Sequence, residues 1–507
     1  MCKLCEEGYP QYHGASRRNF LKNATGAGIA AFAFGSLNSP VSAAEVPEPI
    51  PSAPPRNSGW ADKRYLIRGG AVLSMDTKVG DFVKADVLIE GKKIIAVRPN
   101  IEAGNAEVID ANGKIVMPGF IDTHHHQFET TLRSYLSNGM LVDDGKPHGA
   151  VNYMGTILGK FSPVYKPEDV YIAELFGSLS QLDAGVTTVH DLSQIHHSPA
   201  HTDAAIKGIE DSGRRTVFAY SESQGNKLTF GNDVRRLKTQ YFASKDQLMT
   251  LSIGGEIYAP DFDDAWKVGR SLDLPIALHV VGHTLRGAFT RIARTGKLGK
   301  DNLLIHMTGV DDETWKIVAD SGAGVSLSVP IEMAMRHGTP PIMKALLQGI
   351  EPSLSSDVEC TMTADFFTQM RGAFTLQRMI VNEAALKGET DLPELLTARD
   401  VIRFATRRGA EDLWLGDKTG SLTPGKEADI ILLDATAINV APLNNVPGAV
   451  VTLMDRSNVE TVIVAGKIRK WKGRLLDADI PALSSAITAS RDRIFAAAKL
   501  PVNLFGN

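Results

Sequence analysis

The sequence is poor in cysteine, has no excess of positive charge and lacks a long uninterrupted hydrophobic run. Only Cys2, Cys5 and Cys360 occur among the 507 residues, which is too few for a fold built on a disulfide framework. The net charge of −4 provides no basic surface, so we expect no nucleic-acid partner. No apolar run reaches the roughly 20 residues that cross a bilayer, so we expect no stable membrane span.

The overall composition is that of an ordinary globular protein. Hydrophobic residues make up 43% of the chain and charged residues 22%, which is a balance that supports a sizeable buried core. A length of 507 residues is enough for about two to four domains. We therefore look for domain boundaries in the local patterns of the sequence.

Residues 1–44 are predicted to be an export signal rather than part of the fold. Arg17 and Arg18 belong to the twin-arginine pattern Ser-Arg-Arg-Asn-Phe-Leu-Lys, and a weakly apolar stretch rich in glycine and alanine follows it. Small residues around Ala43 provide a cleavage site, and the proline-rich residues 45–60 form a linker. We expect the twin-arginine export machinery to carry the folded protein to the periplasm or out of the cell.

Two segments far apart in the sequence share a pattern of short strands and turns. Residues 61–117 contain apolar runs, two of which are joined by a hairpin turn at 90–92. Residues 416–476 contain two more apolar runs bounded by turn residues. Neither segment is long enough to make a good sheet alone, so we predict one small β-sandwich built from both chain ends.

Residues 118–415 alternate short apolar strands with helical stretches, which is typical of a parallel α/β architecture. Eight candidate strands indicate a (β/α)8 TIM barrel, whose active site lies at the carboxyl ends of its strands. A doubly wound open sheet is the alternative, but no glycine-rich phosphate loop follows any strand. The predicted strands span residues 119–126, 186–193, 216–222, 250–258, 275–282, 302–308, 324–330 and 352–358.

Histidine and aspartate residues occupy the ends of four predicted strands. The first strand ends in His124 and His126, which the alternation of side chains along a strand places on one side. The fifth ends in His279, the sixth in His306 and the eighth in Asp357. Buried ionisable groups are costly unless they are paired or bind a metal, so this set predicts a metal site at one end of the barrel.

The segment Pro-Gly-Phe-Ile-Asp-Thr-His-His-His at 118–126 resembles the first-strand signature of the amidohydrolase superfamily, and the spacing to the later histidines and aspartate agrees. Residues 420–430 and 462–467 resemble the return of that family to its β-sandwich. Residues 324–333 are similar to the cytosine deaminase and triazine hydrolase branch. The resemblance spans residues 65–471, which is nearly all of the chain beyond the predicted signal.

The resemblance implies one divalent metal ion, zinc or else iron, held by His124, His126, His279 and Asp357. Such an ion lowers the pKa of a bound water and helps to present it to the substrate. The resemblance also implies that Asp357 takes the proton of the water and passes it to the leaving group. His306 would polarise the substrate or hydrogen-bond the nucleophile.

One position departs from the family pattern. In deaminases of this branch, a glutamate three residues after the fifth-strand histidine carries protons to the leaving amine, and Gly282 occupies that place here. Glycine carries no proton, which disfavours simple deamination of an aminopyrimidine or aminopurine. His283 and Glu332 are the candidates to replace the glutamate, and Glu256 is a candidate bridge to a second metal ion.

Other polar residues near the strand ends are candidates to line the substrate site. The long loop at 141–153 is predicted to be a functional lid, and His125 is predicted to pack against the barrel wall. The candidates for direct contact with the substrate are Glu129, His283, Glu332 and His337. A group after the second strand either lines the entrance or forms a plain polar loop: His190, Asp191, Ser193, His196, His197 and His201.

These patterns predict an exported, mononuclear, metal-dependent hydrolase that acts on a non-peptide C–N bond of a small amide-like or heterocyclic molecule. A deaminase or dechlorinase of a heteroaromatic ring is the nearest alternative, and a catalytically silent periplasmic binding protein is another. Asp357 and His306 argue against the silent protein, because binding alone needs no proton shuttle. The tail at 477–507 is predicted to be helical and to pack on the barrel or on a second subunit of a homo-oligomer.

Overall fold

A computed structural model of the chain describes residues 53–221, 229–255 and 262–505. The predicted export signal and Glu256 lie outside the described residues, and so does the side chain of His283. Within the part of the chain that is described, no helix is both long enough and apolar enough to cross a membrane.

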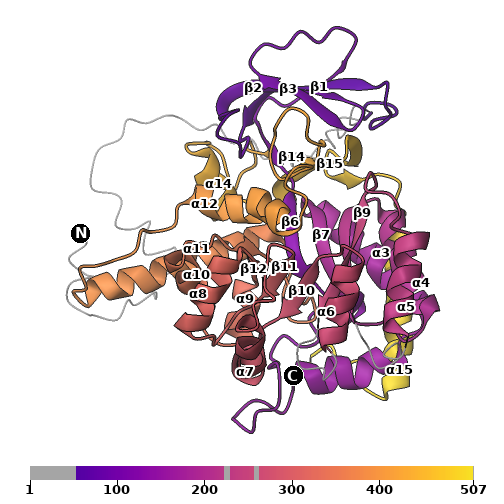
Figure 1. Cartoon of the computed structure of the whole chain (residues 1–507). Coiled ribbons are helices and arrows are strands. Elements are labelled where there is room, and N and C mark those ends of the chain that lie inside the picture. The colour runs from indigo at the N-terminus through magenta and orange to yellow at the C-terminus, as the bar shows by residue number, and fades with distance from the viewer. Residues whose placement is uncertain (1–52, 222–228, 256–261, 506–507) are drawn as a thin grey trace, which may run out of the picture. The chain divides into compact units, whose positions relative to one another are not determined.

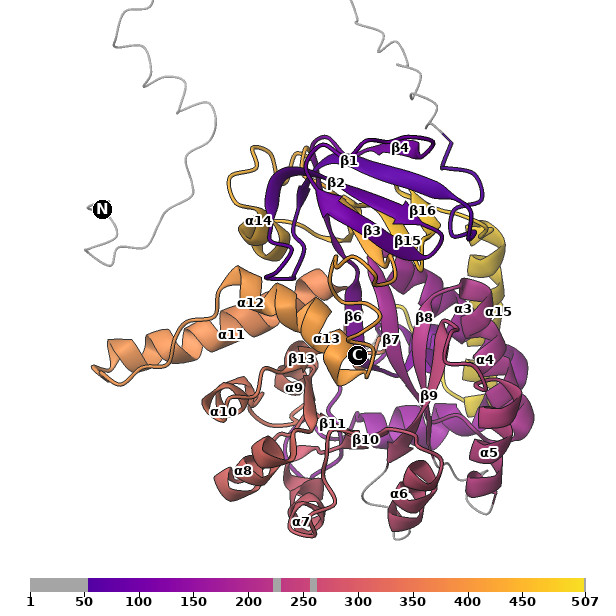
Figure 2. The same ribbon diagram turned by 45° about the horizontal axis from the view of Figure 1, so that its top comes forward.

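Eight parallel strands form the predicted TIM barrel, in sequence order from β6 to β13 (Figures 1 and 2). Their residues are almost all buried, because the helices cover one face and the barrel interior the other. A parallel bridge between His125 and Asp357 links the first strand to the segment after the last. The strands are β6 (Phe120–His125), β7 (Val186–Ser193), β8 (Arg215–Ser221), β9 (Met249–Gly255), β10 (Ile276–His279), β11 (Asn302–Ile305), β12 (Gly324–Leu327) and β13 (Ser353–Leu354).

Helices connect the strands, and their ends follow local sequence signals. Helix α4 (Pro199–Ser212) has a proline in its first turn and ends before Gly213, whose φ of 68° is left-handed. Helix α8 (Asp312–Ser321) follows Asp311, whose carboxylate accepts a backbone hydrogen bond, and ends before Gly322 at a φ of 74°. The other helices are α3 (Pro167–Asp183), α5 (Phe230–Gln240), α6 (Phe262–Ser271), α7 (Gly282–Ala293), α9 (Val329–Ala334), α10 (Ile342–Leu347), α11 (Phe366–Leu386), α12 (Ala398–Arg403), α13 (Gly409–Asp412) and α14 (Val446–Thr452).

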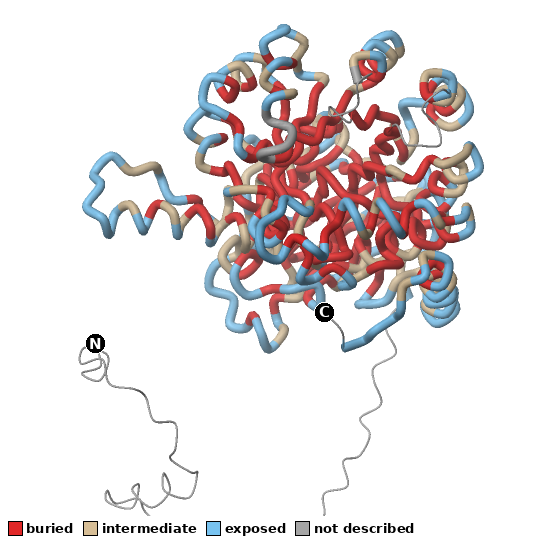
Figure 3. Tube along the Cα trace, turned by 90° about the horizontal axis from the view of Figure 1, so that it is seen from below, coloured by how far each residue is buried: buried red, intermediate tan, exposed pale blue. Residues whose placement is uncertain are grey.

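The helices bury one face each against the barrel and leave the other in solvent. Figure 3 shows this as a buried centre surrounded by helices with exposed outer turns, seen from the side opposite the small sheet. The centre of the barrel is therefore a packed core, and polar side chains that lie there must find partners or a ligand.

A second sheet of nine strands takes its strands from both ends of the chain, as predicted. Strand β5 (Lys114–Pro118) pairs with β1 (Arg64–Val72) on one side and antiparallel with β14 (Ile430–Asp434) on the other. Because β5 leads directly into β6, this sheet fixes the start of the strand that carries the first histidines. The remaining strands are β2 (Phe82–Glu90), β3 (Lys93–Arg98), β4 (Glu107–Asp110), β15 (Val459–Val464), β16 (Lys467–Trp471) and β17 (Arg474–Leu475).

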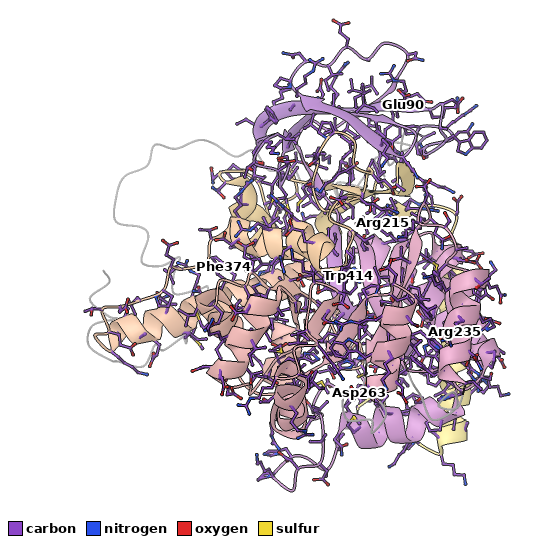
Figure 4. All side chains as sticks on the ribbon, in the orientation of Figure 1. Glu90, Arg215, Arg235, Asp263, Phe374 and Trp414 are labelled. Carbon is purple, nitrogen blue, oxygen red and sulfur yellow. The ribbon has the colours of Figure 1, made fainter. Side chains whose placement is uncertain are left out.

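A buried ion-pair cluster joins the small sheet to the barrel. Arg215, the first residue of β8, contacts Asp429 Oδ2 at 2.7 Å and Glu427 Oε2 at 2.6 Å. The Arg215 side chain is 1% exposed and that of Asp429 is 0% exposed, so each depends on the other for neutralisation. Figure 4 shows Arg215 at the boundary between the small sheet and the barrel strands.

The C-terminal tail forms helix α15 (Ile480–Ala498) and packs on the barrel of its own chain. It contacts α3 and the π-helical segment η2 (Met154–Phe161). The ring of Phe495 lies 4.8 Å from the ring of Phe161, centroid to centroid. Helix α15 therefore supports, from the outside, a segment that reaches the candidate active site described next.

Candidate active site

The structure brings together all five residues that the strand ends were predicted to present: His124, His126, His279, His306 and Asp357. Barrel closure places Asp357 beside β6, because its N–H donates to the carbonyl oxygen of His124 at 3.0 Å and its own carbonyl oxygen accepts from the N–H of His126 at 2.9 Å. Asp357 and His306 have left-handed φ angles of 62° and 71°. Such strained backbone is typical of functional sites.

Ligand-type atoms cluster here in overlapping groups of three: those of His124, His126 and Asp357 lie within 4.8 Å of one another, as do those of His124, His279 and His306 and those of His306, His337 and Asp357. Asp357 Oδ1 lies 3.1 Å from His124 Nε2 and 3.7 Å from His126 Nε2. His124 Nε2 lies 3.3 Å from His279 Nε2. Ligand atoms bound to one tetrahedral zinc ion, with bonds of about 2.0–2.1 Å, lie about 3.3–3.4 Å apart. The donor types and these neighbour distances therefore suit the binding of a divalent metal ion.

The charge states of these groups suit a metal site. Burial lowers the pKa of His124 well below its usual value and lowers that of His306 to about 4, so both imidazoles are neutral at pH 7. Burial alone would raise the pKa of Asp357, but the neighbouring His306 and His124 hold it well below its usual range. Neutral imidazoles and a carboxylate are the protonation states in which these side chains bind metal.

Hydrogen bonds fix the orientation of two of the histidines. His126 Nδ1 donates to the carbonyl oxygen of Leu192 at 2.8 Å, which leaves its Nε2 without a proton and directed toward Asp357. His306 Nδ1 lies 3.1 Å from Glu332 Oε1, which also accepts the N–H of Ser328 at 2.9 Å. Because Glu332 Oε1 is an acceptor, Nδ1 of His306 carries the proton and its Nε2 lone pair faces Asp357 Oδ2 at 3.7 Å.

Glu332 is buried, with 1% of its surface exposed, and it does not line the cavity. The predicted seventh strand runs to Pro330, but β12 ends at Leu327 and α9 starts at Val329 with proline in its first turn. This early helix start brings Glu332 back toward the barrel, where it touches His306. Burial raises the pKa of Glu332 well above its usual value, so the carboxyl group favours its neutral form.

A cavity of about 320 Å³ opens above the cluster of strand-end histidines. Its polar lining includes His337, which was predicted to contact the substrate, and Gln194, which the sequence did not single out. Its other wall is apolar and comes largely from residues 141–158 and the loops after β10, β12 and β13. The apolar lining consists of Leu141, Val142, Tyr153, Met154, Leu158, Val281, Met335 and Val358.

His337 is 3% exposed, and its ring lies edge-on to that of His306 at 4.8 Å. Within the described residues, neither of its ring nitrogens has a hydrogen-bond partner. Burial lowers the pKa of His337 to about 3, so the ring is neutral. The cavity thus contains one neutral imidazole with an unused donor and an unused acceptor.

Two of the other substrate-contact candidates, Glu129 and Glu332, do not line the cavity. Glu129 is fully buried behind Tyr153, whose hydroxyl donates to Glu129 Oε1 at 2.6 Å, so Tyr153 faces the cavity in its place. Gly282 is the first residue of α7, and the side chain of His283 is outside the described residues. Of the two candidates to replace the glutamate expected at Gly282, Glu332 contacts His306 but does not line the cavity.

Two histidines on and just after β7, His190 and His196, make hydrogen bonds within the fold and do not reach the cavity. His190 Nε2 pairs with Ser252 Oγ at 3.2 Å, and His196 Nδ1 pairs with Thr202 Oγ1 at 3.0 Å. Both are fully buried, and neither lines the cavity. His125 packs in the barrel wall as predicted, with Nδ1 at 2.9 Å from Ser356 Oγ.

The fold and the site define a barrel hydrolase with a candidate metal site, and comparison with protein families identifies the family. Residues 115–469 match the model of the amidohydrolase family, so the chain belongs to that family. It is 27% identical over 436 residues to a 5'-deoxyadenosine deaminase of Methanosarcina mazei, covering 82% of this chain and 94% of that protein. It is 26% identical over 431 residues to a 5-methylthioadenosine/S-adenosylhomocysteine deaminase of Symbiobacterium thermophilum, covering 80% and 93%.

Solved structures share the fold. An adenosine deaminase from Xanthomonas campestris with bound zinc has a TM-score of 0.74 at 21% identity, covering 86% of this chain and 100% of that one. Atrazine chlorohydrolase from Arthrobacter aurescens, complexed with zinc, also has a TM-score of 0.74, at 20% identity and with coverage of 84% and 100%. At these identities the likeness concerns the fold.

Proposed function

We propose that this chain is a metal-dependent amidohydrolase that hydrolyses a non-peptide C–N bond in a small amide-like or heterocyclic molecule. The observation that supports this most strongly is the cluster of His124, His126, His279, His306 and Asp357 at the base of a small cavity. The donor set suits zinc, and iron is the alternative.

The geometry assigns a task to each side chain. His124, His126, His279 and Asp357 would hold a divalent ion, which would act as a Lewis acid and lower the pKa of the attacking water. Asp357 accepts a proton from that water as it attacks an sp2 carbon, and then passes the proton to the leaving nitrogen. The lone pair of His306 Nε2, 3.7 Å from Asp357 Oδ2, accepts a second hydrogen bond from the same water and orients it.

Glu332 holds His306 in the required tautomer, so we expect Glu332→Leu to lower kcat by about 10- to 100-fold with little change in KM. Glu332→Gln keeps an acceptor for both His306 Nδ1 and Ser328 N, and it matches the neutral carboxyl that burial favours. The glutamine variant should therefore stay within about threefold of the parent. Steady-state kinetics test this, with the exposed Glu383→Leu as control. Equal losses in both Glu332 variants would contradict the positioning role.

Metal content of the purified protein is the direct test of the centre. Elemental analysis should find about one zinc or iron per chain, and His279→Ala should lose it together with the hydrolytic activity. The matched control is His148→Ala, because His148 is an exposed histidine in the loop at 141–153. Two ions per chain would contradict the mononuclear site, and a metal-free active enzyme would contradict the proposed chemistry.

Deamination of a ring, with ammonia as the leaving group, is the second candidate. The curated relatives named above are deaminases of adenosine derivatives, and the structural relatives include a chlorohydrolase of a triazine. Both likenesses favour the branch of the family that acts on heteroaromatic rings. The glycine at position 282 disfavours it, because protonation of a ring nitrogen needs an acid at the place where Gly282 carries none.

We also propose that the protein is exported through the twin-arginine route to the periplasm or beyond. Support comes from the arginine pair, Arg17 and Arg18, followed by a weakly apolar stretch and small residues near Ala43. Replacing both arginines by lysine should leave the full-length precursor in the cytoplasm, whereas Arg56→Lys should leave export intact. Cell fractionation and mass measurement of the mature N-terminus provide the readout. A processed periplasmic product from the double variant would refute this route.

A further inference from the structure

One wall of the cavity consists of apolar side chains that remain partly exposed to solvent. Leu141, Val142 and Leu158 are half-buried and Met154 is 40% exposed, yet all four line the cavity above the metal-type centre. Apolar surface left in water costs roughly 25 cal/mol for each Å². A ligand that covers this wall recovers that free energy, so the wall is suited to an apolar group.

Backbone hydrogen bonds hold the wall in place before any ligand binds. The N–H of Leu141 donates to the carbonyl oxygen of Met335 at 3.0 Å, and the N–H of Met154 donates to that of Leu141 at 3.1 Å. Arg336 Nη1 donates to Asp144 Oδ1 at 2.9 Å and so ties the middle of the loop to the end of α9. A preformed wall binds a matching group without an ordering cost.

His337 supplies the polar complement to this wall. Its neutral ring is buried in the same cavity, next to His306, with both nitrogens unpaired among the described residues. A buried polar group without a partner is unfavourable, and a hydrogen-bonding ligand relieves this cost. Among the described lining residues, Asp357 alone carries a formal charge at pH 7. No lysine or arginine occurs in that lining, so a carboxylate at the distal end of a ligand would be buried against the apolar wall without a partner.

We propose that the substrate is a neutral amide with a compact alkyl or aryl group, its amide paired with His337 and its apolar group against the 141–158 wall. This deepens the proposed function and rests on it. Water adds its oxygen to the amide carbon, the C–N bond breaks, and Asp357 carries one water proton to the leaving nitrogen, giving a carboxylic acid and an amine. Amide hydrolysis needs this one proton shuttle, so the missing acid at Gly282 is no obstacle.

A series of anilides with acyl chains of increasing length tests whether the apolar wall binds the alkyl group of the substrate. With the metal-loaded enzyme, kcat/KM for the 4-nitroanilides of acetic, butyric and hexanoic acid should rise about fourfold for each methylene that covers the wall. The 4-nitroanilide of succinic acid, with a terminal carboxylate, should be at least about tenfold slower than the butyric one. Leu158→Ser should flatten the rise with chain length, whereas the exposed Leu347→Ser should keep the slope of the parent.

His337 variants test the polar contact. His337→Phe, which fills the space without hydrogen bonding, should raise KM for the butyric anilide about tenfold with a smaller change in kcat. His337→Gln should recover part of the loss, which a purely packing role would not predict. A succinic anilide that equals the butyric one, or a flat chain-length series, would overturn the assignment. Turnover of adenosine without turnover of any anilide would also overturn it while leaving a C–N hydrolase in place. Failure of both classes with the metal bound would instead count against the proposed function.

Discussion

Asp357→Asn is expected to lower kcat by about 10²–10⁴-fold, because the variant loses the group that moves the proton between water and the leaving nitrogen. The amide side chain keeps an oxygen at nearly the same place, so the backbone contacts of position 357 with His124 and His126 should persist. The amide is neutral and binds a divalent ion less tightly than a carboxylate does. Activity is therefore measured at saturating metal, and metal content is measured on the same samples.

The matched control is Asp391→Asn, because Asp391 is exposed and far from the strand ends in the sequence. This control should keep the activity and the metal content of the parent. An Asp357→Asn enzyme that retains more than about a tenth of parental kcat with metal bound would remove the proton shuttle from Asp357. Turnover that stops in this variant would also exclude the silent binding protein, because binding of a ligand needs no proton transfer.

The barrel could be predicted because each strand is a short apolar run that ends in a polar residue. Even β13, with two residues, lies where the run Pro-Ser-Leu-Ser-Ser-Asp suggests it. The cluster of strand-end residues could also be predicted, since alternation along β6 and the common carboxyl edge of parallel strands bring His124, His126 and His279 to one end of the barrel, whereas the choice of metal ligands among them came from the family resemblance. These are local patterns combined with one rule of topology.

The contacts that join distant residues could not be read in this way. Glu332 reaches His306 only because α9 begins at Val329, whereas the apolar sequence there also suits a continued strand. Proline in the first turn of a helix is common, but Pro330 alone does not distinguish a helix start from a strand end. The partner of Glu332 was therefore visible only in three dimensions.

The loop at 141–153 was predicted to be a functional lid, but the apolar character of the cavity wall that it forms was not predicted, for a related reason. The loop at 141–153 reads as polar because Asp143, Asp144 and Lys146 dominate its middle, and these residues are exposed. Its ends, Leu141 and Tyr153, turn inward because their backbones pair with neighbouring segments. No periodic pattern marks such a wall, since its apolar residues come from several loops. Loop length was the one available signal.

Arg215→Met is expected to lower the free energy of unfolding by about 3–5 kcal/mol, which is the largest stability change we foresee. The methionine fills most of the space, but Asp429 and Glu427 then remain buried without the cation that neutralises them. The loss should weaken the attachment of the small sheet at the start of β8. Chemical denaturation monitored by circular dichroism, at fixed metal concentration, measures the change.

Arg270→Met is the matched control, because Arg270 makes the same kind of contact with Asp301 at 3.0 Å but both side chains are about 40% exposed, at 42% and 37%. An exposed pair contributes about 0–1 kcal/mol, so this control should lie close to the parent. Equal losses in the two variants would show that burial of the cluster does not govern its strength. A large loss of stability in Arg215→Met alone would show that the buried cluster attaches the small sheet to the barrel. Activity retained by the folded fraction would show that the cluster takes no part in the chemistry at the carboxyl end of β6.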